Sequence, residues 1–311
     1  MNTQSGALSD SFGAQQAAPA ALSATHPLYW SIRRELAENR WIYIGQWAIA
    51  VVFLVGALIS TVHLPAHMRA LAAKPPSQRW EAVATHYNIA AGVFMATLIL
   101  MSLFYSAEAL HSERRDRSVL FWKSLPVSDR TTVLAKASIP LVVLPLLTFA
   151  ITVVVQAIML LLSSVVLAAN GLSVAAFWSD LAPLSMWGKL LHHLLTAHAL
   201  WPFPIYCWLL LVSAWARRAT LLWAALPVVA IGGVEKLIFN TSHFVEMVGG
   251  RLIGAGAPID ITPSGGMFPM GPMTHITLAR FLASPGLWIG LAVAAAFLAA
   301  AVQLRRYRGP I

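Results

Sequence analysis

The stretch WIYIGQWAIAVVFLVGALISTVHL, residues 41–64, carries no Asp, Glu, Lys or Arg. A helix rises about 1.5 Å per residue, so about 20 apolar residues cross the roughly 30 Å hydrocarbon core of a bilayer. Five more stretches meet this length and composition, at about 84–110, 139–169, 190–215, 219–239 and 284–304. The sequence therefore predicts an all-α polytopic membrane protein with six transmembrane helices.

The composition of the whole chain supports this class. The 311 residues are 58% apolar and only 11% charged, with a mean hydropathy of +0.70. Soluble domains carry about 25% charged residues, so the composition disfavours a soluble globular fold. The single cysteine, Cys207, cannot form a disulfide within the chain.

The net charge of +9 is consistent either with nucleic-acid binding or with orientation in a membrane, and the distribution of basic residues favours the second. With the N-terminus inside, fourteen Lys and Arg residues fall in cytoplasmic segments and seven in outer segments, together the 21 of the chain. Cytoplasmic loops carry the excess of basic residues in membrane proteins. We therefore expect a multi-pass protein of the inner (cytoplasmic) cell membrane with both termini cytoplasmic and no nucleic-acid partner.

The segments around the spans differ in character. Residues 1–25 are rich in Ala, Ser and Gln, which predicts a disordered cytoplasmic tail. Residues 26–40 have a modest apolar face, which predicts an interfacial amphipathic helix before the transmembrane domain of 41–311. Residues 240–283 are too polar to span the membrane twice, so we expect short interfacial or re-entrant helices broken by Gly and Pro on the outer side.

Prolines interrupt two of the predicted spans. Pro140 and Pro145 lie in the third, and Pro202 and Pro204 lie in the fourth. Proline lacks a backbone N–H and its ring collides with the preceding turn, so we expect kinks at both places.

The densest charge cluster is HSERRDRSVLFWKSLPVSDR, residues 111–130, between the second and third predicted spans. Its apolar residues recur at every third position: Val119, Trp122 and Leu125. This spacing predicts a short helix that Pro126 ends, and Ser128 is the expected cap of the helix that leads into the third span. A helix of about two turns is not stable alone in water. It needs either the lipid headgroups or a groove in a soluble partner, and the residues leave both alternatives open.

The longer stretch SERRDRSVLFWKSLPVSDRTTVLAK closely resembles the first cytoplasmic loop of permease subunits of ABC-2 type transporters. The resemblance covers about 25 residues, and the six-span layout is consistent with it. In that family the loop is a coupling helix that contacts the ATP-hydrolysing subunit. The resemblance implies an ATPase interface at Glu113, Arg114, Asp116 and Arg117 and a docking element at Val119, Phe121, Trp122, Lys123, Leu125 and Pro126.

The resemblance also implies partners and a function. The sequence has no G-x-x-x-x-G-K-[ST] motif and no soluble stretch long enough for a nucleotide-binding domain. ATP and Mg²⁺ are therefore expected in a partner ATPase, present in two copies, and this chain is expected to bind no cofactor and to catalyse no reaction. A second permease chain, identical or homologous, would complete the pathway, and export is the expected direction.

Two groups of residues on the predicted outer side resemble metal ligands. His63 and His67 are four residues apart, as zinc ligands on one helix face are, and Met267, Met270 and Met273 offer soft thioethers suited to Cu(I). The alternative is that the histidines meet water and headgroups while the methionines pack within a Pro-rich loop.

Three polar residues fall in or near predicted spans. Glu235 and Lys236 are either intramembrane functional groups or ordinary residues of the interface, depending on where the fifth span ends. Gln156 is either a cavity or helix-contact hydrogen bonder or a residue with no special role.

Two other functions are open on the sequence alone. One is an integral-membrane acyl or lipid-head transferase that uses His192 or His193 as a base, although the chain has no H-E-x-x-H or G-x-S-x-G motif. The other is a non-transporting assembly or sensor subunit whose loop binds a partner.

Overall fold

The structure is a computed structural model that describes residues 25–72, 75–116, 127–254 and 278–307. Regular secondary structure within these ranges is entirely helical. In chain order the helices are α1 (Thr25–Glu38), α2 (Trp41–Ser60), α3 (Leu64–Ala72), α4 (Pro76–Glu108), α5 (His111–Arg115), α7 (Asp129–Ser138), η1 (Ile139–Val143), α8 (Leu144–Ala169), α9 (Val174–Leu181), α10 (Pro183–His193), η2 (Leu194–Leu200), α11 (Phe203–Trp215), α12 (Thr220–Phe239), α13 (His243–Ile253), α14 (Leu278–Ala283) and α15 (Pro285–Tyr307). The predicted all-α class is confirmed.

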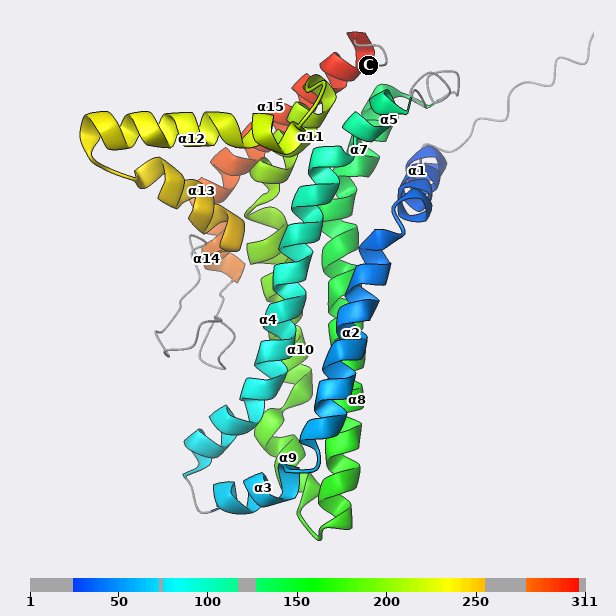
Figure 1. Ribbon diagram of the computed structural model, residues 1–311, viewed down its shortest axis with the longest axis vertical. Coiled ribbons are helices and arrows are strands. Elements are labelled where there is room, and N and C mark those ends of the chain that lie inside the picture. The colour runs from blue at the N-terminus through cyan, green and yellow to red at the C-terminus, as the bar shows by residue number, and fades with distance from the viewer. Residues whose placement is uncertain (1–24, 73–74, 117–126, 255–277, 308–311) are drawn as a thin grey trace, which may run out of the picture.

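The helices α2, α4, α8 and α11 run along the long axis of the molecule and form a bundle (Figure 1). α11 packs against α4 and α15, while α8 packs against α2 and α4. One apolar cluster in the bundle contains Leu98 and Tyr206, and a second, toward α3 and α9, contains Phe94 and Leu160. The bundle therefore has two ends, one where α3 and α9 lie and one where α1, α5 and α7 lie.

The number of helices able to cross a membrane is five or six, depending on how one bent pair is counted, whereas the sequence predicts six. Five segments of the described chain are long and apolar enough to cross a membrane: Trp41–Ser60, Ala82–Arg115, Asp129–Ala169, Thr220–Phe239 and Pro285–Tyr307. A sixth results only if Val174–Leu200 and Phe203–Trp215, which are bent by 43° relative to each other, count as one span. The fourth predicted span is thus a broken helix, because Pro202 and Pro204 cannot donate to the preceding turn.

The third predicted span stays one continuous helical segment despite its two prolines. Pro140 lies in η1, a π-helical turn in which the Leu144 N–H donates to the carbonyl of Ile139, five residues earlier. The wider turn accommodates the ring that would collide with the carbonyl four residues back in an α-helix. A second wide turn, η2, ends where the Trp201 N–H donates to Thr196 O at 2.9 Å. η1 and η2 are in contact, so both wide turns lie at one level of the bundle.

The first apolar helix, α2, ends at Ser60, four residues before its predicted end. The Ser60 and Thr61 hydroxyls donate to the carbonyls of Ala57 and Leu58 at 2.8 and 2.6 Å. The chain then turns, and α3 begins at Leu64 and crosses the end of the bundle (Figure 1). This short crosswise helix had no counterpart in the sequence-based prediction.

The fifth predicted span forms α12, but this helix lies across the bundle near the end that holds α5 (Figure 1). Ala219 before it and Asn240 after it both have a φ of 51°, so the chain turns sharply at each end. α13 returns beside α12, and Gly232 leaves the space that Val245 fills. α13 and α14 are short helices within the stretch expected to contain them, and 255–277 lies outside the described residues.

Candidate functional site

Six charged residues from four helices meet at the end of the bundle where α1, α5, α7 and α15 lie (Figure 1). We call this group the ionic cluster: Arg34 and Glu35 of α1, Glu113 of α5, Asp129 and Lys136 of α7, and Arg305 of α15. In a chain with only 11% charged residues, this convergence is the strongest concentration of ion pairs that the structure describes.

Lys136 is the centre of the ionic cluster. Its Nζ lies 2.8 Å from Glu35 Oε1 and 3.1 Å from Glu113 Oε1. The side chains of Lys136, Glu35 and Glu113 are only 2%, 1% and 6% exposed. The Tyr105 hydroxyl of α4 donates to Glu35 Oε2 at 2.9 Å, so both oxygens of that buried carboxylate have partners.

Two arginines complete the ionic cluster. Arg305 Nη1 lies 2.6 Å from Glu113 Oε2, and its Nε lies 3.0 Å from Asp129 Oδ1. Arg34 Nη2 lies 3.0 Å from both Glu35 Oε1 and Glu113 Oε1. Three cations therefore face three carboxylates, and Glu113 alone contacts helices α1, α7 and α15.

At the rim, Glu38 pairs with Arg34 one turn earlier on α1, at 3.4 Å. Burial raises the pKa of the Glu38 carboxyl, and the Arg34 guanidinium opposes that shift. The rim is thus partly exposed, while the Lys136 centre is closed to water.

The sequence at the start of α7 explains why Asp129 and Lys136 both point toward the ionic cluster. Ser128 has extended backbone geometry and its Oγ accepts from the Thr131 N–H at 3.1 Å, which is a typical N-cap. This confirms the predicted helix start. Asp129 and Lys136 are seven residues apart, nearly two full turns, so both side chains lie on the face that α1 and α15 cover.

The ion pairs of the ionic cluster fix the relative positions of the helices more than they stabilise the fold. Buried charges lose hydration, and a buried ion pair rarely stabilises a fold more than apolar residues would. Removal of one partner, however, leaves a buried charge unpaired and costs about 3–5 kcal/mol. The ionic cluster therefore holds α1, α5, α7 and α15 in one mutual arrangement.

A second set of contacts ties α5 to the end of α11. Arg114 Nη1 donates to Ala214 O at 2.8 Å and to Ala216 O at 3.3 Å, and His111 Nδ1 lies 3.3 Å from Ala216 O. The last carbonyls of a helix have no partner within the helix, so these side chains satisfy them. α5 is thus held on one side by the ionic cluster and on the other by α11.

The structure places the predicted ATPase-contacting residues in two environments. Glu113 and Arg114 point into their own chain, as the distances above show, and Asp116 lies exposed beside Arg115 at 3.2 Å. The remaining residues of that prediction lie outside the described residues: Arg117, Val119, Phe121, Trp122, Lys123, Leu125 and Pro126. α5 and α7, which the two sets of contacts hold in place, flank the segment that contains them.

Sequence reasoning did not identify Glu35, Lys136, Arg305 and Tyr105 as members of a site. One signal was available, because Lys136 is followed at once by a long apolar run, where a charge is costly without a partner. The sequence did not indicate the partner of Lys136, because Glu35 lies 101 positions away along the chain.

The proposed metal ligands are only partly described. His63 and His67 line one cavity together with His86, but the described residues contain no group of three or more His, Cys, Asp or Glu placed to hold a metal ion. Met267, Met270 and Met273 lie outside the described residues. The described geometry therefore gives the zinc hypothesis no support.

The polar residues predicted near spans make contacts between helices. Gln156 Nε2 donates to Tyr87 O at 3.0 Å, and its Oε1 accepts from Trp187 Nε1 at 3.0 Å. Glu235 is half-buried, and its carboxylate accepts the backbone N–H groups of His243 and Phe244 at 2.8 and 2.9 Å, at the first turn of α13. Gln156 thus joins α8 to α4 and α10, and Glu235 caps α13.

Lys236, the neighbour of Glu235, lies exposed in the last turn of α12. A basic side chain at that position interacts favourably with the helix dipole.

Comparisons with known proteins identify no family for this chain. Neither protein-family models, nor curated proteins, nor solved structures give a match. The function must therefore be argued from the sequence and from the ionic cluster.

Proposed function

We propose that this chain is the membrane-spanning permease subunit of an ATP-driven transporter of the ABC-2 type. It would work as an exporter with six spans, and the 111–130 loop would couple it to a separate ATPase subunit. Two observations support the proposal: the sequence of the loop resembles the coupling loop of such permeases, and both flanks of the loop are anchored in the ionic cluster.

The anchoring of the loop is the observation that carries the proposal. Glu113, before the loop, and Asp129 and Lys136, after it, share partners in the ionic cluster. A partner that displaced the loop would therefore displace α5 and α7 together, and with them α1 and α15. Coupling between distant sites travels through such packed and hydrogen-bonded elements. α7 continues through η1 into α8, so the motion would reach the middle of the bundle.

The proposal assigns the chemistry to other chains. The sequence lacks a P-loop motif, so two copies of an ATPase would bind ATP and Mg²⁺ and this chain would bind no cofactor. A second permease chain, identical or homologous, would enclose the pathway. Both termini and the loop would face the cytoplasm, where the ATPases are.

Photocrosslinking in the native host tests the docking of the loop. A photoreactive benzoylphenylalanine at Trp122 is expected to capture a P-loop ATPase that is encoded near this chain. The same amino acid at Trp178, on α9 at the other end of the bundle, is the matched aromatic control and is expected to capture none. A Trp122 adduct with lipid alone, or equal capture from both positions, would refute the docking.

Reconstitution separates the remaining functions. The complex should hydrolyse ATP faster with transported cargo present, and disruption of the ionic cluster at Lys136 should abolish that stimulation while the ATPase remains bound. An ATPase that docks but never responds to cargo favours the assembly or sensor function. Turnover of an acyl or lipid-head donor by the chain alone favours the transferase.

A further inference from the structure

At the end of the bundle opposite the ionic cluster, two hollows join. The first is a chamber of about 340 Å³ between α2, α3, α4, α8 and α9, and the second is a groove of about 310 Å³ between α2 and α4. They share four lining residues: Ala57, Ser60, His86 and Met159. Each volume falls within the range of small-molecule sites, about 300–1,000 Å³.

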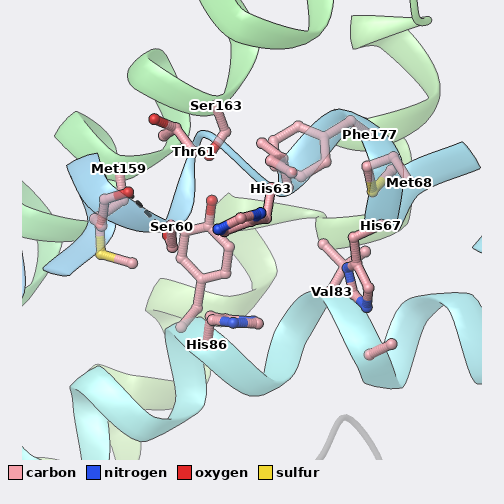
Figure 2. A pocket seen from close by; sticks show the side chains of 14 residues that line it. Ser60, Thr61, His63, His67, Met68, Val83, His86, Met159, Ser163 and Phe177 are labelled. Atoms are coloured by element: carbon pink, nitrogen blue, oxygen red, sulfur yellow. Dashed lines mark hydrogen bonds between the residues drawn. The ribbon is translucent and has the colours of Figure 1, made fainter.

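Three histidines line the chamber. Figure 2 shows the imidazoles of His63, His67 and His86 around one opening. None of the three side chains has a hydrogen bond to another described residue, and no carboxylate is among the described residues that line the chamber. The Ser60 and Thr61 hydroxyls already donate to backbone carbonyls. Each imidazole can therefore donate an N–H to a bound molecule, and a described lining without a carboxylate suits an anion better than a cation.

The groove, in contrast to the polar chamber, is mostly apolar. Apart from Ser60 and His86, at its junction with the chamber, its lining is apolar, and Val52 and Ile89 are exposed on the outer face of the bundle. From Val52 to Ser60 it follows nine residues of α2, a rise of eight helical steps or about 12 Å. This length is close to half of the roughly 30 Å hydrocarbon core, the depth of one leaflet.

The position of the chamber matches the headgroup layer. α2 has 20 residues, enough to cross the hydrocarbon once, so Ser60 lies at its edge. His63 directly precedes α3 and His67 lies in its first turn, and α3 crosses the end of the bundle (Figure 1). The groove then lies beside the acyl chains of one leaflet and the chamber beside its phosphates.

We propose that the chamber and groove together bind one membrane phospholipid, with a phosphate oxygen accepting from the three imidazoles and an acyl chain in the groove. The inference does not depend on a transport function. Gly56 offers a sharp test because it lines the groove, and a Cβ added there meets no atom within 4 Å. The Cβ of Gly56→Leu has open space, so its branched end extends into the groove, and loss of a helical glycine favours the folded helix.

Native mass spectrometry of the purified full chain, titrated with palmitoyl-oleoyl phosphatidylglycerol, measures the binding. We expect one tightly retained phospholipid in the parent and at least about tenfold weaker retention in Gly56→Leu, since each displaced methylene weakens binding about fourfold. Gly233→Leu is the matched control, because Gly233 is also an exposed helical glycine with open space around it, on α12. Equal retention by the parent and Gly56→Leu would overturn the proposal.

A second experiment tests the binding of the headgroup phosphate. It compares the double variant His63→Ala with His86→Ala against His243→Ala on α13, which is the control. Loss of two hydrogen bonds to a phosphate should weaken phospholipid retention by about 100-fold or more. Binding of diacylglycerol with the same chains, already weaker in the parent, should not change. Diacylglycerol retained as well as the phospholipid by the parent, or full displacement by glycerol phosphate without acyl chains, would contradict a phospholipid site.

Discussion

Replacement of Lys136 by methionine removes the central cation of the ionic cluster and keeps a side chain of similar length. Two buried carboxylates, Glu35 and Glu113, lose the ammonium that lies 2.8 and 3.1 Å from them. Glu113 keeps Arg305 and Arg34, whereas Glu35 keeps Arg34 and the Tyr105 hydroxyl. The uncompensated charge is therefore concentrated on Glu35.

The expected cost follows from burial. Removal of one partner from a buried ion pair costs about 3–5 kcal/mol, and this Lys136 side chain is 2% exposed. In domains of about 150–250 residues, about 1 kcal/mol corresponds to a shift in Tm of roughly 2–4 °C, and the shift is somewhat smaller in a longer chain. Lys136→Met should therefore lower Tm by on the order of 10 °C. The double variant Lys136→Met with Glu35→Gln removes both charges and should recover more than half of that loss.

The chain contains a natural reporter for this measurement. Cys207 is its only cysteine and is fully buried, so a thiol-reactive fluorophore reacts as the bundle unfolds. Lys236→Met is the matched control, because Lys236 is exposed at the end of α12 and its replacement should change stability by about 0.5 kcal/mol or less. A Tm of Lys136→Met within about 2 °C of the parent, or a double variant less stable than the single one, would refute the structural role of the ionic cluster.

Three smaller predictions test other contacts. Ser128→Ala should destabilise the fold by about 1 kcal/mol, because the Thr131 N–H loses its cap, whereas Ser128→Gly should cost only a few tenths of that, measured by the same thiol assay. Gln156→Leu should cost about 1–3 kcal/mol, since it leaves the Trp187 indole N–H unpaired, and added Trp187→Phe should restore part of the loss. Glu235→Gln should speed proteolysis at the turn between α12 and α13 and change Tm only slightly, because the carboxylate that caps α13 is only partly buried and the amide keeps an acceptor oxygen; proteolysis at the parent rate would contradict this role.

The sequence predicted the features that depend on neighbouring residues. The apolar runs became helices of nearly the expected length, and Ser128 caps α7 because a hydroxyl three residues before an amide is a local arrangement. Pro202 and Pro204 broke a helix where expected. At Pro140 the helix stays continuous, because the backbone widens around the ring into a π-helical turn.

The features that depend on distant residues were not predictable. Glu113 was expected to face a partner, yet its nearest cations lie on α1, α7 and α15, and no local pattern specifies those contacts. The crosswise direction of α12 is set by single left-handed residues, Ala219 and Asn240, at its ends. Alanine carries no sequence signal for that conformation, so the turn could not be foreseen.

The two π-helical turns interrupt two neighbouring helices at one height. An α-helical hydrogen-bond ladder is stiff, but η1 and η2 lie against each other, so two neighbouring helices are softened at one height. From this height to Asp129 the lever arm is ten residues, or about 15 Å, and a tilt of about 10° would move Asp129 by roughly 3 Å. That displacement is as long as the 3.0 Å contact between Asp129 Oδ1 and Arg305 Nε, so a tilt of this size at mid-bundle would separate the pair.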